Sequence, residues 1–171
     1  MRFNFTLAAV AAILAATPAV AQQATTTEPA EARGVVLQSL TLSKISNLDF
    51  GTVAGSNTIP GNVVVDPDSG ARTSTGVTLM PGAFSRARFD GFGVPGNSVV
   101  LTLTPPAGNV LTNAGGVPLT INSMTLDSGG KNRTIGGTGQ FTVYVGGDFQ
   151  IAAAQANGLY TATFNLTAVY Q

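Results

Sequence analysis

The stretch that decides the fold is GLYTATFNLTAVYQ, residues 158–171. Side chains of a β-strand alternate between two faces, so this stretch has one polar and one apolar face. The polar face is rich in threonine, and the apolar face holds Tyr160, Ala162, Phe164, Leu166, Ala168 and Tyr170. Because β-branched and aromatic residues favour a half-buried pleated surface, we predict one long strand from Gly158 to Tyr170.

A strand of this kind needs a cover, because its free backbone groups are a template for another chain. Two interpretations are open. Another strand of the same fold covers it, or a strand is added from another molecule. In the second case the assembly strand is defined by Gly158, Tyr160, Phe164, Leu166 and Tyr170.

The N-terminal residues 1–21 have the pattern of a secretory signal peptide. Arg2 precedes a short apolar run at 7–16, and Ala19-Val20-Ala21 forms an A-x-A cleavage site, which predicts Gln22 as the mature N-terminus. The apolar run is shorter than the roughly 20 residues of a membrane span. We therefore predict an exported protein without a transmembrane segment in its mature chain.

Composition excludes several function classes. Removal of Arg2 leaves 7 basic and 8 acidic residues, so no basic surface is expected to attract nucleic acid. The chain has no cysteine and no histidine, which excludes disulfides and histidine-dependent catalysis. We expect no enzyme activity, no cofactor and no metal site.

Residues 22–33 (QQATTTEPAEAR) have the composition of a flexible arm. The plain interpretation is a disordered mature terminus. The functional alternative is a donor strand that completes a neighbouring subunit, with the following segment contributing its apolar anchors. The candidate donor residues are Ala30, Ala32, Val35 and Leu37.

Residues 34–171 read as a single domain of short strands separated by glycine, asparagine and proline. Strands are expected at 35–45, 48–53, 62–66, 76–80, 85–92, 99–104, 117–126, 140–146, 148–154 and 158–170. This pattern predicts an all-β fold, an immunoglobulin-like antiparallel β-sandwich that is open to completion by a donor strand.

Several motifs together carry a family resemblance. Leu40–Lys44 is followed by Leu48–Val53, then by Ala87–Gly91 and Val99–Pro105, and the end combines Val145–Gly147 with Gly158 and Tyr170. This order resembles the domain-of-unknown-function 4402 family of exported bacterial proteins. That family in turn is similar to spore-coat-U and Mat (Ecp)-like fimbrial subunits of the chaperone–usher route. The resemblance implies a pilin role, although many fimbrial subunits have a disulfide that this chain lacks.

The structural motif Leu48-Asp49-Phe50-Gly51 places Leu48 and Phe50 on one face, with Asp49 on the other, where it is expected to accept hydrogen bonds from a turn. Asp66-Pro67-Asp68-Ser69-Gly70 resembles the start of a calcium loop but lacks the remaining ligands, so we interpret it as a turn.

These observations favour a structural or adhesive subunit of a bacterial surface fibre, a pilus or fimbria. Its expected partners are copies of itself or other fibre subunits, a periplasmic chaperone and an outer-membrane usher. The expected location is the periplasm in transit and then the cell surface. The alternative is a self-contained exported β-sandwich that binds a ligand such as a polysaccharide.

Overall fold

The computed structural model describes residues 26–171. The predicted signal peptide, residues 1–21, and the start of the arm lie outside the described residues. Residues 26–39 form neither helix nor strand and are exposed, and residues 36–171 form one compact unit. No helix in the described part is long and apolar enough to cross a membrane.

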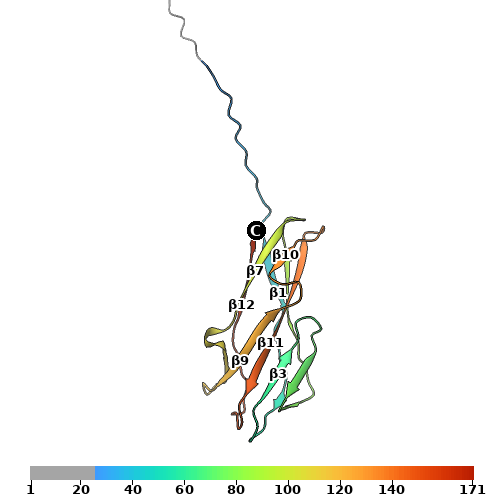
Figure 1. Cartoon of the computed structure of the whole chain (residues 1–171), viewed down its shortest axis with the longest axis vertical. Coiled ribbons are helices and arrows are strands. Elements are labelled where there is room, and N and C mark those ends of the chain that lie inside the picture. The colour runs from blue at the N-terminus through green and yellow to red at the C-terminus, as the bar shows by residue number, and fades with distance from the viewer. Residues whose placement is uncertain (1–25) are drawn as a thin grey trace, which may run out of the picture. The chain divides into compact units, whose positions relative to one another are not determined.

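The unit is built almost entirely from antiparallel strands (Figure 1). The strands are β1 (Thr41–Ser46), β2 (Val53–Ala54), β3 (Gly61–Val65), β4 (Arg72–Thr75), β5 (Thr78–Leu79), β6 (Ala87–Phe92), β7 (Ser98–Thr104), β8 (Val110–Thr112), β9 (Pro118–Leu126), β10 (Asn132–Thr134), β11 (Gln140–Ile151) and β12 (Asn165–Tyr170). One short 3₁₀ helix, η1 (Ala107–Asn109), precedes β8. β2 and β5 form a small separate pair.

The larger sheet is organised around β11, which pairs with β9 along one edge. Its other edge is shared, because β6 pairs with its first half and β3 with its second half. β1 then extends the sheet beside β6, β4 beside β3, and β8 beside β9. The change from β6 to β3 falls at Gly146, where a Cβ atom would overlap the carbonyl oxygen of Val65.

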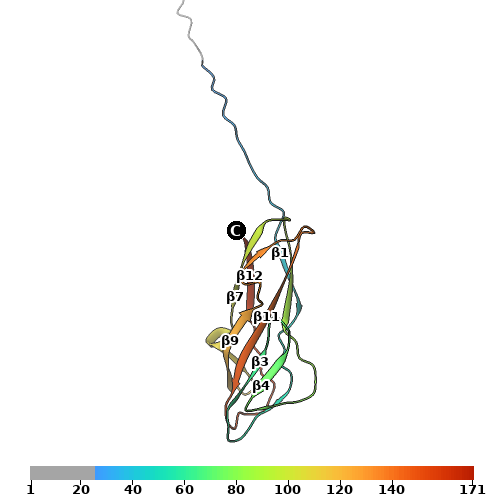
Figure 2. The same ribbon diagram turned by 45° about the vertical axis from the view of Figure 1, so that its right-hand side comes forward.

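The smaller sheet has the order β10-β7-β12. Figures 1 and 2 show β7 and β12 side by side, with β12 running to the C-terminus. Because β12 is the last strand in this order, one of its edges has no strand partner within the described chain.

The core divides into two clusters. The first lies between the two sheets and holds Ala87, Phe89, Val99, Leu101, Ile135, Phe141, Val143 and Val145. The second lies on the other half of the larger sheet and holds Val63, Leu119, Phe149 and Ile151. Half-buried side chains pack against this second cluster: Phe50 and Tyr160 come from loops, and Val53 and Leu79 come from the small β2–β5 pair. The smaller sheet therefore covers only half of the larger one.

The prediction of an all-β antiparallel sandwich is confirmed. Some boundaries were wrong: β11 is continuous over the two strands expected at 140–146 and 148–154, and the first strand starts at Thr41 instead of residue 35. The expected strand from Gly158 to Tyr170 is also shorter, because only residues 165–170 pair with β7. Within residues 158–164 only Thr161 is paired, in an isolated bridge to Thr112 of β8, and Gly158 has a φ of 145°.

Candidate functional site

A cleft of about 870 Å³ opens where the second layer is missing. Two segments form its lips, residues 47–57 after β1 and residues 155–162 before β12. Its apolar lining includes Phe50, Leu111, Leu119, Ile121, Met124, Phe149, Ile151, Leu159, Tyr160 and Phe164. The residues of the second core cluster are at most 6% exposed. The accessible lining of the cleft consists of half-buried side chains such as Phe50, Tyr160 and Phe164, together with the exposed Leu159.

The lip at residues 47–57 is held by its own hydrogen bonds. Asp49 exchanges two backbone bonds of 2.8 Å with Ser85, and its carboxylate accepts the N–H of Gly51 at 2.8 Å. The guanidinium of Arg72 donates to the carbonyl of Phe50 at 2.8 Å. These bonds hold the Phe50 ring edge-on to Phe149, with 4.5 Å between the ring centres.

The lip at residues 155–162 is held mainly through one side chain. The hydroxyl of Tyr160 donates to the carbonyl of Ala156 at 2.6 Å and accepts the amide of Gln155 at 2.9 Å. Thr161 exchanges two backbone bonds with Thr112 of β8. In the described chain, residues 157–160 and 162–164 form no backbone–backbone hydrogen bond.

The two lips differ in their backbone hydrogen bonding. The first lip is held by backbone and side-chain hydrogen bonds, whereas most residues of the second lip form no backbone–backbone hydrogen bond. In an antiparallel pair, a residue that exchanges both bonds with its partner is flanked by residues whose groups point the other way. Since Thr161 is bonded to β8, the N–H and C=O groups of Tyr160 and Ala162 are directed away from β8. The lip before β12 therefore carries the unpaired backbone groups that an added strand needs.

The inward face of β12 is only half-buried. Leu166, Ala168 and Tyr170 pack against the first core cluster but retain partial exposure, whereas Val99 and Leu101 on the neighbouring β7 are fully buried. Of the predicted assembly residues, Gly158, Tyr160 and Phe164 line the cleft. Leu166 and Tyr170 do not line it and pack against the first core cluster.

The candidate donor residues Ala30, Ala32, Val35 and Leu37 are all exposed. Val35 is 87% exposed and Leu37 is 46% exposed. Large apolar side chains that remain in solvent are available to another surface.

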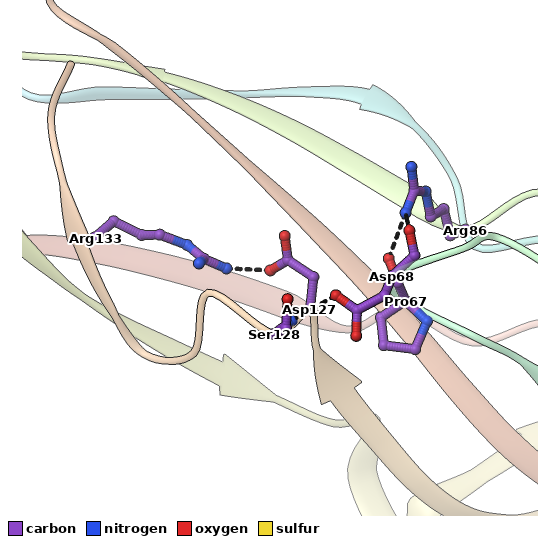
Figure 3. Close-up of polar contacts among 6 residues, drawn as sticks. All are labelled: Pro67, Asp68, Arg86, Asp127, Ser128 and Arg133. Carbon is purple, nitrogen blue, oxygen red and sulfur yellow. Dashed lines mark hydrogen bonds and ion pairs between the residues drawn. The ribbon is translucent and has the colours of Figure 1, made fainter. Parts of the chain in front are cut away.

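The turn at 66–70, which has two aspartates, and the turn that begins at Asp127 are joined by polar contacts (Figure 3). The carboxylate of Asp68 accepts the N–H of Ser128 at 2.7 Å, and Asp127 forms an ion pair with Arg133. Arg86 donates to the carbonyls of Pro67 and Asp68. The turn at 66–70 is therefore tied to the turn at 127–130.

Asp66 closes its own turn. The backbone N–H of Ser69 and then its hydroxyl donate to the carboxylate of Asp66, and these bonds hold its pKa below the usual value. Within residues 26–171 no group of three or more acidic, histidine or cysteine side chains is arranged to hold a metal ion.

Two residues that shape the cleft were not predicted as site residues from the sequence. Arg72 lies in a polar stretch, yet it reaches Phe50 and Met80. Gln155 lies in an alanine-rich stretch, yet it bonds to Tyr160 and to the carbonyl of Pro118. Their roles depend on contacts between distant segments, which spacing along the chain does not encode.

Fold and site together define a class, an antiparallel β-sandwich whose second layer is incomplete on one half. The family model described as "Domain of unknown function (DUF4402)" matches residues 40–170, and the chain belongs to that family. No curated protein and no solved structure matches the chain.

Proposed function

We propose that this protein is a structural or adhesive subunit of a bacterial surface fibre, a pilus or fimbria, assembled by strand exchange. In this proposal the N-terminal arm of one subunit fills the cleft of the next. The observation that carries it is the incomplete second layer, an apolar cleft bordered by residues 157–164, of which Thr161 alone forms backbone–backbone hydrogen bonds. A strand added there would pair with the free backbone groups of this segment and cover the half-buried apolar lining of the cleft.

The chain supplies a suitable strand. Val35 and Leu37 alternate as a strand face requires, and both are exposed. A contact in which an arm on one surface fills a cleft on another is heterologous and propagates into fibres when it does not close. The same arrangement calls for a periplasmic chaperone to cover the cleft first and an outer-membrane usher to deliver the exported subunit to the surface. Kinship with spore-coat-U and Mat (Ecp)-like fimbrial subunits is part of this proposal.

Cysteine cross-linking tests the proposal directly, because the chain has no cysteine of its own. We expect the double variant Leu37→Cys, Ala162→Cys to form a ladder of disulfide-linked oligomers under mild oxidation. The matched control Leu37→Cys, Thr73→Cys places the second thiol on β4, away from the cleft, and should give no ladder. Equal ladders from both variants, or none from either, would contradict strand exchange at the cleft.

The second candidate function is a self-contained exported binding module. The volume of the cleft lies within the range of about 300–1,000 Å³ that is typical of small-molecule sites, and its apolar lining is accompanied by the polar groups of Gln155 and Tyr160. A monomer that stays stable without residues 22–37 and binds a ligand such as an oligosaccharide would favour this function.

A further inference from the structure

The hydroxyl of Tyr170 joins the segment that follows β6 to the segment that precedes β1. It accepts the N–H of Val94 at 2.9 Å and donates to the carbonyl of Gln38 at 2.9 Å. Gly93 leaves room for this hydroxyl, since a Cβ atom there would lie 2.5 Å from it and 3.1 Å from Leu40. The site is therefore shaped around a hydroxyl group at this position.

The bond to Gln38 holds the chain just before β1, where the side chain of Leu40 also packs against the first core cluster. Among residues 36–40 of the described chain, Gln38 alone forms a hydrogen bond. Without it, Val36, which is 97% exposed, and Leu37 have little to restrain them.

Gln38 is held at the end of β12 that is remote from the cleft. Tyr170 is the last residue of β12, whereas the cleft is lined by residues that precede its first residue, Asn165. At about 3.3 Å per residue, the six residues of β12 span about 20 Å. The chain enters β1 at this end and reaches the cleft lip at residues 47–57 only after β1. Residues that precede Gln38 would therefore have to span this length to fill the cleft of their own domain.

We propose that Tyr170 is a positioning residue that fixes the point at which the arm leaves the domain, so that the arm is offered to the cleft of a second copy of this chain. The directing role rests on the proposed function, and the anchoring of Gln38 does not. Tyr170, the last residue of β12, thereby also determines whether the arm fills the cleft of its own domain or that of a second copy.

The test compares the full mature chain with its Tyr170→Phe variant, which keeps the ring and removes the hydroxyl. A spin label on a cysteine at Ser39, an exposed position, reports the mobility of the arm root. The label should be restrained in the parent chain and mobile in the variant, and the Val94 amide should exchange faster. Elongation should slow by about tenfold, which equals about 1.4 kcal/mol and is the upper range for one neutral hydrogen bond.

Leu166→Ala is the control, because it weakens the packing of β12 without touching the hydroxyl. It should lower the unfolding temperature and leave the label restrained. A label that is equally mobile in the parent chain and in Tyr170→Phe would overturn the anchor. A label released by Tyr170→Phe without a change in elongation would overturn the directing role. A parent chain that never polymerises would refute the proposed function, and the label would still decide the anchor.

Discussion

At the scale of single residues, the Asp127–Arg133 ion pair is the polar contact with the largest expected effect on stability. Its side chains are only 16% and 12% exposed. Removing one member of a buried pair leaves the other charge without a partner. We expect Arg133→Ala to lower the free energy of unfolding by about 3 kcal/mol, measured by urea denaturation.

The Glu31–Arg33 pair is the matched control, since its side chains are 70% and 81% exposed. Exposed pairs contribute about 0–1 kcal/mol, so Arg33→Ala should leave the unfolding curve almost unchanged. Equal losses from the two variants would show that burial does not distinguish these pairs.

Asp90 gives a prediction about pH. Hydrogen bonds, first from Arg88 and then from Thr142, hold the pKa of the Asp90 carboxyl below its usual value. A carboxyl whose pKa is lower in the folded state stabilises the fold above its unfolded pKa, about 3.9, and this contribution is lost as pH falls through the folded pKa. The stability difference between the parent chain and Asp90→Asn should therefore be constant near neutral pH and shrink below about pH 4. A difference that grows in acid would contradict this assignment.

At the scale of elements, β11 depends on a glycine where its edge passes from β6 to β3. A Cβ at Gly146 would meet the backbone of Val65 and the ring of Pro67, neither of which can move aside locally. Because overpacking of this kind costs about 1–3 kcal/mol, Gly146→Ala should lower the thermal midpoint clearly. Gly137→Ala, where no atom lies within 4 Å of the added Cβ, is the control.

The terminal element shows what sequence could and could not predict. Alternation correctly placed Leu166, Ala168 and Tyr170 on the inward face, because strand period is a local property. The same alternation continues through Tyr160, yet residues 158–164 form no strand. The reason is non-local: Thr161 alone has a backbone partner, Thr112 of β8, and the side chain of Tyr160 bonds to Gln155 and Ala156. The cleft was likewise not predictable, since it results from the unequal extent of two sheets.

This element also carries a prediction about assembly. Phe164→Asp places a charge in the lining of the cleft, where an added strand would bury it at high cost. We expect it to block oligomer formation in size-exclusion chromatography. Thr167→Asp, on the exposed outer face of β12, should assemble normally. Normal assembly of Phe164→Asp would show that the cleft is not the assembly surface.

At the scale of the whole molecule, the missing part of the second layer should limit stability until a strand fills it. Covering a large apolar side chain contributes roughly 1.5–3 kcal/mol, whereas a domain has only about 5–15 kcal/mol in total. We expect a chain without residues 22–37 to remain monomeric and to have a low thermal unfolding midpoint. The deletion stops before Gln38 because Leu40 packs on the core and Gln38 bonds to Tyr170.

Restoring the missing strand in the same molecule should reverse this defect. Fusing residues 26–37 after Gln171 requires a linker that spans the length of β12, about 20 Å or at least six extended residues. We expect this fusion to be a monomer that melts about 10 °C higher than the truncated chain, since about 3 kcal/mol shifts the midpoint of a domain of this size by that amount. The control carries Val35→Ser and Leu37→Ser in the fused segment. It should lose the increase in melting temperature, because no large apolar side chain would then enter the cleft. If the truncated chain already melts as high as the fusion, then the cleft is a stable feature of a complete domain, and the binding-module function is the better description.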